Sequence, residues 1–342
     1  MNQTGISSYT EPQLAELVKE MGQPAFRAKQ LFKWLHEKQA RFFSEMTDQP
    51  KAFLAALEER FFIETLETER RQQSKDGTVK YLFRLPDGNC IETVLMRYSY
   101  GNTVCVSTQV GCRFCASTQG GRVRNLTAGE IANEVYAAAR DTGERVSHIV
   151  LMGIGEPLDN FDHVMDFLSI ISSPNGVNIG MRNISLSTCG LVPMIYKLAE
   201  RHLGLTLSVS LHAPTDEMRS SMMPVNDVYP VEQLIRACRD YQQETGRRVS
   251  FEYSMVNGVN DSPQTARRLA QLIKGMGAHV NLIPINPVDG SPYSATDAAN
   301  VKRFQTLLTE LGVNATVRRR LGTDISAACG QLRREAKGGT TA

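Results

Sequence analysis

Two cysteines three positions apart, Cys112 and Cys115, are the strongest chemical signal in the sequence. Two thiolates at this spacing can bind one metal centre, commonly zinc or an iron–sulfur cluster. A zinc site would use a second pair of ligands, and the sequence contains no other C-x-x-C and no H-x-x-H. A thioredoxin-like dithiol is a further interpretation of the same two residues.

Isolated cysteines are a weaker signal. Cys105 lies in an apolar run seven residues before Cys112, and Cys329 lies in the segment 324–332. An isolated cysteine is most often a small buried apolar residue, so a chemical role needs further support. The remaining cysteines are predicted to be buried residues of this kind: Cys90, Cys189 and Cys238.

The segment GIGEP at residues 153–157 follows a strongly apolar run. Its two glycines would let a ligand approach the backbone closely, and the carboxylate of Glu156 could bind an amino group. The segment lacks the third glycine of a dinucleotide-binding loop, and an ordinary turn at the end of a strand is an equally good interpretation.

His212 and Glu92 are two further candidates with plain alternatives. His212 follows Ser210 and Leu211, and a histidine in such a place is most often a hydrogen-bonded structural residue. Glu92 alternates with apolar residues in a strand-like run, which is also typical of a glutamate that faces solvent.

Strand-like and helical patterns alternate from about residue 103, and they predict the elements that would position these residues. Repeated βα units favour an α/β fold with a parallel sheet and helices outside it. The expected strands are 104–107, 148–152, 184–187, 206–211, 249–255, 280–284 and 315–319. The expected helices are 128–141, 161–171, 192–201, 231–244, 264–275 and 300–311.

Unusual residues lie where the expected strands end. These segments are 153–156, 187–188, 210–212 and Asn286. Ligands of parallel α/β folds bind at the carboxyl ends of the strands. One pocket that collects the four segments is therefore predicted.

The first part of the chain has a different pattern. Helices are expected at 11–21, 26–38 and 50–60, and two strands at 79–85 and 90–97. The residues Pro86-Asp87-Gly88-Asn89 between these strands are typical of a hairpin turn.

Composition excludes several classes of protein. The 342 residues carry 38 basic and 36 acidic side chains and are 42% hydrophobic, which is unlike a disordered, collagen-like or coiled-coil chain. The start of the sequence has no secretory pattern, and no apolar run approaches ~18 residues. With seven cysteines and no such signal, we expect a cytoplasmic enzyme without a membrane partner.

Basic residues cluster at Arg122/Arg124, at 318–320 and at 333–334. Such clusters are usually solvated surface. They are also the residues that bind nucleic-acid phosphates, so an RNA partner is compatible with them.

Taken together, these segments resemble the radical-SAM adenine-C2 RNA methyltransferases of the RlmN/Cfr family, and FCAST at 114–118 is closer to the dual-specificity RlmN branch. The resemblance covers nearly the whole chain. It runs through IETVLMRY (91–98), TVCVSTQVGC (103–112), FCAST (114–118), MGIGEPLDN (152–160), SLSTCG (185–190), SVSLHAP (208–214), MPVNDVYP (223–230), HVNLIPIN (279–286) and DISAACGQLR (324–333).

The resemblance implies a partial (β/α)6 radical-SAM barrel with a small helical N-terminal domain and a connecting hairpin. It also implies a [4Fe-4S] cluster and S-adenosylmethionine (SAM). The implied domains are a helical accessory domain (1–75), a β-hairpin linker (76–97), the radical-SAM core (98–331) and a basic tail (332–342). The implied partners are 23S rRNA, tRNA and an electron donor such as flavodoxin or ferredoxin.

The resemblance also implies a role for the residues of each motif. Gly155 and Glu156 would meet the amino group of SAM. The rest of the SAM pocket would be formed by Ser187, Ser210, Leu211, His212 and Asn286. Cys112 and Cys115 would bind the cluster.

The substrates implied for the family are an adenosine of the peptidyl-transferase centre and, in the RlmN branch, adenosine 37 of certain tRNAs. C2 of adenine is electron-poor, so one SAM would first methylate the Cys329 thiolate by nucleophilic displacement. A second SAM would be cleaved reductively at the cluster to activate the S-methyl group. Glu92 would accept the C2 proton, and Cys105 would form a transient disulfide with Cys329.

The cysteine loop departs from the family pattern. The family has C-x3-C-x2-C, whereas GCRFCAST lacks four residues, including the middle cysteine. Three explanations are open: a local deletion or error, recruitment of Cys105 as a third ligand, or a homologue that has lost radical chemistry. A catalytically inactive RNA-binding paralogue is therefore the competing function, and a redox or zinc protein is a third.

Overall fold

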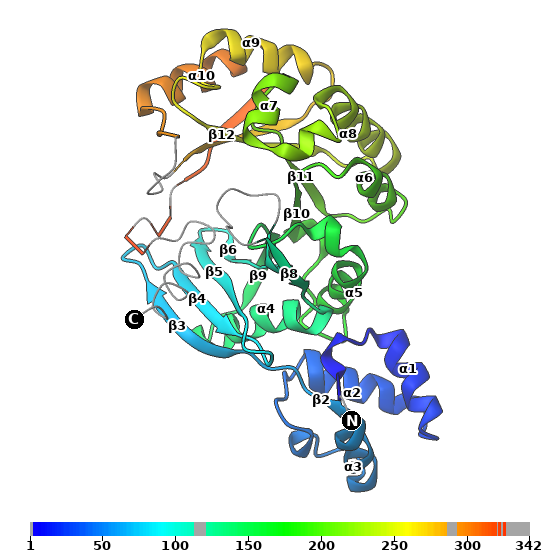
Figure 1. Cartoon of the computed structure of the whole chain (residues 1–342). Coiled ribbons are helices and arrows are strands. Elements are labelled where there is room, and N and C mark those ends of the chain that lie inside the picture. Colours follow the sequence, from blue (N-terminus) through cyan, green and yellow to red (C-terminus); the bar gives the residue numbers. More distant parts are fainter. Residues whose placement is uncertain (1–2, 113–120, 286–292, 320, 323, 326–342) are drawn as a thin grey trace. The chain divides into compact units, whose positions relative to one another are not determined.

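A computed structural model describes residues 3–112, 121–285, 293–319, 321–322 and 324–325. The chain forms two compact units (Figure 1). Unit 1 comprises residues 1–113, 117–184 and 322–342, and unit 2 comprises residues 114–116 and 185–321. No helix among the described residues combines the length and apolar character needed to cross a bilayer.

Three helices open unit 1, namely α1 (Glu11–Glu20), α2 (Phe26–His36) and α3 (Lys51–Arg60). Apolar residues at helical spacing bury one side of each helix; in α1 these residues are Leu14, Leu17 and Val18. Short strands β1 (Thr4–Gly5) and β2 (Phe61–Phe62) pair in parallel. In the sequence, β1 precedes the three helices and β2 follows them.

The sheet of unit 1 combines antiparallel and parallel pairs. Its strands are β3 (Glu67–Gln73), β4 (Val79–Arg84), β5 (Cys90–Tyr98), β6 (Gly101–Cys105) and β9 (Val146–Leu151). The first four are antiparallel neighbours, and β6 pairs with β9 in parallel. Helix α4 (Ala128–Thr142) covers one face of this sheet, and α5 (Phe161–Ser172) packs against α4 (Figure 1).

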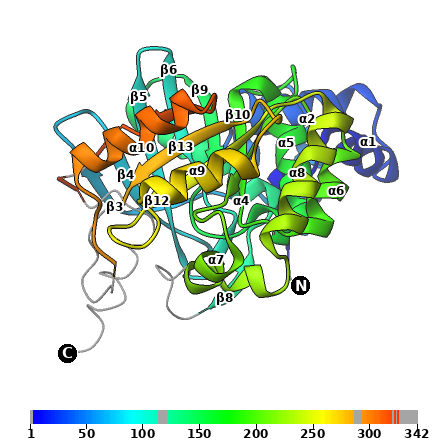
Figure 2. The ribbon, with the colours of Figure 1, turned by 90° about the horizontal axis from the view of Figure 1, so that it is seen from above.

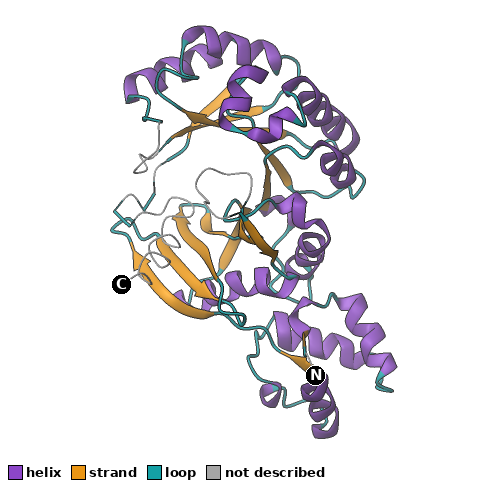
Figure 3. Cartoon of the chain, viewed as in Figure 1, coloured by secondary structure: helices purple, strands orange, loops and turns teal. Residues whose placement is uncertain are grey.

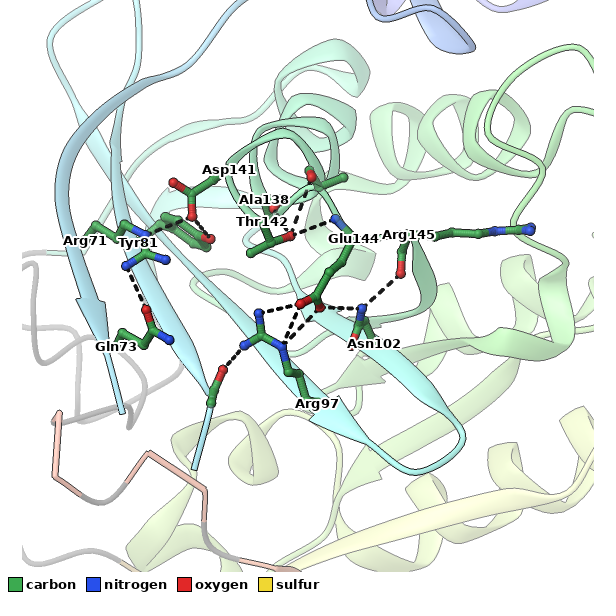
Figure 4. Close-up of polar contacts among 12 residues, drawn as sticks. Arg71, Gln73, Tyr81, Arg97, Asn102, Ala138, Asp141, Thr142, Glu144 and Arg145 are labelled. Atoms are coloured by element: carbon green, nitrogen blue, oxygen red, sulfur yellow. Dashed lines mark hydrogen bonds and ion pairs between the residues drawn. The ribbon is translucent and has the colours of Figure 1, made fainter. Parts of the chain in front are cut away.

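Polar contacts attach strands of unit 1 to α4 and to the turn that follows it (Figure 4). The Arg97 guanidinium at the end of β5 binds the carboxylate of Glu144, with 3.0 Å between Nη2 and Oε1. Asn102 of β6 donates to the same carboxylate. On β4 the Tyr81 hydroxyl donates to Asp141 at the end of α4. These contacts fix the antiparallel strands relative to the helix.

The described part of unit 2 has five parallel strands whose order follows the chain; Figure 3 draws them in orange. They are β10 (Ile184–Thr188), β11 (Thr206–Ser210), β12 (Val249–Met255), β13 (His279–Pro284) and β14 (Asn314–Val317). Parallel neighbours need crossover connections, which are provided by α6 (Val192–Ala199), α8 (Val231–Thr245), α9 (Pro263–Leu272) and α10 (Ala298–Glu310). Helices α9 and α10 lie side by side (Figure 2).

The predicted alternation of strands and helices is confirmed, and β12 matches its expected range residue for residue. Elements that the sequence did not predict include β1, β2, β3, the short strands β7 (Gln109–Gly111) and β8 (Arg122–Asn125), and α7 (Asp216–Met222). Cys189 and Cys238 are buried as predicted. The prediction for Cys90 is wrong, because this residue begins β5 beside an exposed turn and is partly exposed.

Candidate functional site

Glu92 lies in the interior of unit 1 rather than in solvent. Its side chain on β5 is 4% exposed and forms an ion pair with Lys80 of β4, with 3.2 Å between Oε2 and Nζ; the Lys80 side chain is fully buried. The interpretation of Glu92 as a solvent-facing glutamate is therefore wrong. Alternation alone did not reveal this, because the lysine that accompanies Glu92 into the interior also looks like a surface residue.

Cys105 lies on the same face of the sheet as Glu92. It pairs with Val94 across the antiparallel strands β5 and β6, and Val94 is two residues from Glu92. Residues two apart on a strand share a face, and directly opposed residues do too. Glu92 and Cys105 are thus diagonal neighbours, a relation with a Cα separation of roughly 7–8 Å.

Ser107, just after β6, connects this face to the GIGEP segment. Its hydroxyl donates to the backbone oxygen of Glu92 (2.7 Å) and accepts from the backbone N–H of Ile154 (3.1 Å). Both carboxylate oxygens of Glu134 accept from the Ser107 N–H, and burial raises the pKa of Glu134 well above its usual range. No sequence motif pointed to Ser107 or Glu134, although a glutamate on the apolar side of helix 128–141 was an available signal.

Gly155 is required by the backbone of the GIGEP segment. Its φ is +112°, and a Cβ at this position would lie 2.7 Å from the backbone nitrogen of Gln109. The Gln109 side chain accepts from the backbone N–H of Glu156 (2.9 Å). The Glu156 side chain is almost fully buried, and its Oε1 accepts from the N–H of Leu158 (3.0 Å).

Cys112 is buried directly after β7, which forms an antiparallel pair with β8. Ion pairs hold β8: Arg122 binds Asp159 (2.8 Å), and Arg124 binds Glu130 (2.7 Å). Both arginines form ion pairs within the protein, and their side chains remain 35% and 30% exposed. Cys115 lies outside the described residues, as do Asn286 and Cys329.

The parallel sheet of unit 2 has one polar face. Strand register places Ser187 opposite Ser208, and Ser210 opposite Glu252, which in turn lies opposite Asn281. The alternate residues of these strands, such as Val209 and Phe251, are fully buried apolar side chains. Burial raises the pKa of Glu252, and a hydrogen bond from Asn281 (2.8 Å) opposes this effect.

Leu211 and His212, just after β11, form a turn that is hydrogen-bonded to β12. The N–H groups of Leu211 and His212 both donate to the backbone oxygen of Glu252 (3.1 and 3.2 Å). His212 has a left-handed φ of +57°, and its Nδ1 accepts from the N–H of Ser254 (3.1 Å). Burial and the nearby charge of Arg219 lower the pKa of His212 to about 4, so the ring is neutral near pH 7 and carries its proton on Nε2.

The sequence-predicted residues therefore fall into two groups. Unit 1 contains Glu92, Cys105, Cys112, Gly155 and Glu156, and unit 2 contains Ser187, Ser210, Leu211 and His212. Within unit 1, Ser107 and Gln109 link the strand ends to the GIGEP segment. Within unit 2, the register brings the serines and the His212 turn to neighbouring strand ends.

The donor groups suit SAM better than they suit a cluster. In unit 1 the GIGEP backbone and carboxylate can bind an amino group. In unit 2 the serine-rich strand ends carry hydroxyl groups that can bind a nucleoside. The residues that the structure describes contain no group of three His, Cys, Asp or Glu side chains that could hold a metal. The cysteine loop contains two thiols, whereas a cluster with one open iron uses three.

Comparisons with known proteins agree with these observations. The sequence matches two family descriptions, the "Radical SAM superfamily" over residues 107–270 and the "Ribosomal RNA large subunit methyltransferase N-terminal domain" over residues 4–63. A probable dual-specificity RNA methyltransferase RlmN of Clostridium botulinum (strain Eklund 17B / Type B) is 49% identical over 334 residues, 96% of each chain. A protein of the same description from Staphylococcus aureus (strain Newman) is 52% identical over 92% of this chain and 88% of its own.

A solved structure has the same fold. The crystal structure of a radical SAM methyltransferase from Sphaerobacter thermophilus matches with a TM-score of 0.90 and 46% identity, over 96% of this chain and 98% of that one. The α/β radical-SAM fold implied by the sequence resemblance is thereby confirmed.

Proposed function

The chain belongs to the RlmN/Cfr family of radical-SAM RNA methyltransferases, and from this we propose that it methylates C2 of adenosine in RNA. The proposed substrates are an adenosine of 23S rRNA at the peptidyl-transferase centre and adenosine 37 of certain tRNAs. The observation that carries this proposal is the shared face of Glu92 and Cys105, because the reaction needs a proton acceptor and a thiol close together.

The proposed roles of the residues follow from their chemistry. The Cys329 thiolate takes a methyl group from SAM and becomes a thioether. Glu92 accepts the proton that leaves C2 of the adenine. The activated methyl carbon on Cys329 would bond to C2 of the adenine. The Cys105 thiolate would then attack the Cys329 sulfur, so that a disulfide forms as the sulfur–carbon bond breaks and the released carbon takes a proton to become the methyl group. No disulfide links cysteines within the described part of the chain.

SAM is proposed to bind at the strand ends. Gly155 and Glu156 are proposed to bind its amino group, and Ser187, Ser210, Leu211, His212 and Asn286 are proposed as its further binding residues. A [4Fe-4S] cluster held by Cys112 and Cys115 would supply the electron for reductive cleavage of SAM, and flavodoxin or ferredoxin would deliver that electron. We further propose that residues 1–75 form an accessory domain, that 76–97 link it to the core at 98–331, and that 332–342 form a basic tail.

The cysteine loop favours a second candidate function. With two thiols in the loop, the chain would be an RNA-binding paralogue without radical chemistry unless Cys105 or another ligand completes the cluster. Recruitment of Cys105 as a ligand would remove it from the role of releasing the RNA. The two functions therefore differ in cluster content.

Anaerobic iron–sulfur reconstitution distinguishes them. About four irons per chain, together with a reduced EPR signal that changes when SAM is added, would support the methyltransferase, and Cys105→Ala would then test the third ligand. A folded, RNA-binding chain without a cluster would refute the radical mechanism for this protein. Insertion of the four missing loop residues would then show whether the shortened loop alone is responsible.

Methyl transfer itself is tested with labelled SAM and 23S rRNA or tRNA. Glu92→Gln keeps the size of the side chain and removes the proton acceptor, so turnover is expected to stop. Glu69→Gln on strand β3 of the same sheet is the matched control, because Glu69 is half-exposed and pairs with Arg84 at the surface. Equal activity of the two variants would refute the role of Glu92.

A further inference from the structure

Arg219 is a buried arginine of α7 to which neither the sequence motifs nor the proposed chemistry assigns a role. Its side chain is fully buried in unit 2. Helix α7 follows the turn at the end of β11 (Figure 1) and begins at the Thr215 hydroxyl, which accepts from the N–H of Met218.

The guanidinium of Arg219 binds the ends of two neighbouring strands. Its Nη2 donates to the backbone oxygens of Cys189 (2.6 Å), just after β10, and Ser210 (3.1 Å), at the end of β11. Its Nε donates to the backbone oxygen of Leu211 (3.2 Å), and its Nη1 to the side-chain oxygen of Asn226 (3.1 Å). The planar donor fork of arginine makes such divergent contacts possible, whereas a lysine ammonium is a single point of charge.

The surrounding sequence makes room for this group. Gly190 has a φ of +102°, and a Cβ there would lie 3.3 Å from Nη2 of Arg219 and 2.9 Å from the Leu234 side chain. Burial lowers the pKa of Arg219 to about 10, so the group remains charged near pH 7. A buried charge is costly, and its hydrogen bonds to backbone carbonyl groups compensate for that cost.

Asn260 holds the same turn from the side of β12. Its Nδ2 donates to the backbone oxygens of His212 and Ser254, both at 2.7 Å, and its Oδ1 accepts from the N–H of Val256 (2.8 Å). Asn260 is fully buried, and the Tyr253 hydroxyl donates to its backbone oxygen (2.8 Å). All polar groups of this amide are thus used to fix one backbone conformation.

The residue between these two groups is in a conformation that side chains rarely adopt. His212 is left-handed, and such strain persists only where the surroundings over-determine the backbone. Arg219 binds the two carbonyl groups before His212, and Asn260 binds the carbonyl group of His212 itself. Together they hold the turn on both sides of the strained residue.

We propose that Arg219 and Asn260 are positioning residues that hold the Ser210–His212 turn in the conformation that binds the nucleoside cofactor. The cofactor part of this inference rests on the proposed function. Neither residue is assigned a contact with the cofactor; each acts through the backbone of the turn. Their loss therefore weakens cofactor binding without removing a cofactor ligand.

The first test measures binding of S-adenosylhomocysteine to the full chain by isothermal titration calorimetry. Arg219→Met and Asn260→Ala are each expected to weaken binding about tenfold, because each leaves buried carbonyl groups unpaired at the turn. Arg219→Lys keeps the charge and provides a folded variant if Arg219→Met does not fold. Unchanged affinity in these variants would refute the proposal.

Arg239→Met is the matched control. Arg239 of α8 also donates to two backbone carbonyl groups, those of Leu272 at the end of α9 and Lys274 just after it, and not to the carbonyl groups of the turn. It should lower the unfolding temperature and leave the affinity unchanged. An equal loss of affinity in Arg239→Met would show that loss of stability alone explains the result, and would refute the positioning role.

The second test needs no cofactor. Imidazole ¹⁵N spectra of the full chain near pH 5 should show His212 neutral with its proton on Nε2, and His212→Gln assigns the signal. Arg219→Met and Asn260→Ala should abolish this form, and its persistence in both would refute the positioning role. If the wild-type chain does not bind S-adenosylhomocysteine but the variants lose the His212 signature, the positioning stands and the proposed cofactor site fails.

Discussion

Lys80→Met gives the most direct test of how unit 1 holds Glu92, the proposed proton acceptor. The ion pair between Lys80 and Glu92 joins adjacent antiparallel strands at 3.2 Å, and the two side chains are 0% and 4% exposed. Methionine fills nearly the same volume as the lysine stem but removes the charge. The carboxylate of Glu92 would then be a buried charge without its lysine.

The expected cost follows from that burial. Removal of one partner from a buried ion pair typically costs about 3–5 kcal/mol, because the other charge is left uncompensated. A destabilisation of this size lowers the unfolding temperature by on the order of 10 °C in a protein of this length. The exposed pair Arg84–Glu69 on the same sheet has side chains 43% and 39% exposed, so Arg84→Met should have little effect.

The assay is urea unfolding followed by the fluorescence of Trp34, the single tryptophan, which lies on α2 of unit 1. A double-mutant cycle with Glu92→Gln isolates the pair from the packing of each residue. We expect a coupling energy at the upper end of the roughly 0.5–3 kcal/mol found for contacting residues. Additive effects of Lys80→Met and Glu92→Gln would refute the argument that the pair is a coupled buried unit.

Three further predictions concern unit 1. Gly155→Ala should lower the free energy of unfolding by about 1–3 kcal/mol and weaken S-adenosylhomocysteine binding, because Gly155 has a positive φ and a Cβ there would meet Gln109. Gly88→Ala is the control, because Gly88 also has a positive φ but open space around it. An equal loss of stability in Gly88→Ala would contradict the steric argument. Burial lowers the pKa of His36 to about 3. As the pH falls from about 6.5 to 3, His36 therefore takes up a proton in the unfolded chain but not in the folded one. The free energy of unfolding should fall over this range by up to about 1.4 kcal/mol per pH unit. His36→Gln should flatten that dependence in urea titrations at pH 7, 6 and 5, and an unchanged slope would show that His36 is not responsible. Ser107→Ala should destabilise the chain by about 1–3 kcal/mol. Amide hydrogen exchange should also become faster at the N–H of Ile154, which loses its acceptor. Exchange changes confined to β6 would count against a connection through Ser107 to the GIGEP segment.

The regular elements could be predicted because their burial is periodic. The strand 249–255 is buried except at Ser254, which is partly exposed, and helix 11–20 buries one side at helical spacing. Strand β3 was not predicted because its sequence, ETERRQQ, is polar throughout. It is an edge strand whose side chains are almost all exposed, so backbone pairing with β4 defines it rather than an apolar face.

The positions of the candidate residues at strand ends could also be predicted, but their partners could not. Lys80 and Glu92 each look like surface residues, and only the register of β4 and β5 shows that they enter the interior together. Arg219 and Asn260 lie 30 residues or more from some of the groups that they bind. Such contacts are set by tertiary structure and leave no periodic signal in the sequence.

The two expected cofactor segments are fixed by different means, and this bears on the shortened cysteine loop. In unit 2 a buried guanidinium and an amide hold the His212 turn. In unit 1 the GIGEP segment is held by close backbone packing, with Gln109 of β7 bound to Glu156 and Arg122 of β8 bound to Asp159. Strands β7 and β8 flank the loop and pair with each other, and a Cβ at Gly111 would lie 2.2 Å from the backbone oxygen of Gly121.

Contacts among described residues hold β7 and β8, so we expect the two strands to keep their places when the loop is lengthened. Gln109 of β7 pairs with Asn125 of β8, and Arg122 forms an ion pair with Asp159. None of these residues belongs to the loop. Insertion of four residues, including a cysteine, after Arg113 would therefore change the number of thiols without requiring either strand to move. If the insertion variant binds a cluster and is as stable as the original chain, the original chain lacks a cluster because its loop has too few thiol ligands. A loss of stability would instead mean that the short loop is part of what holds β7 against β8.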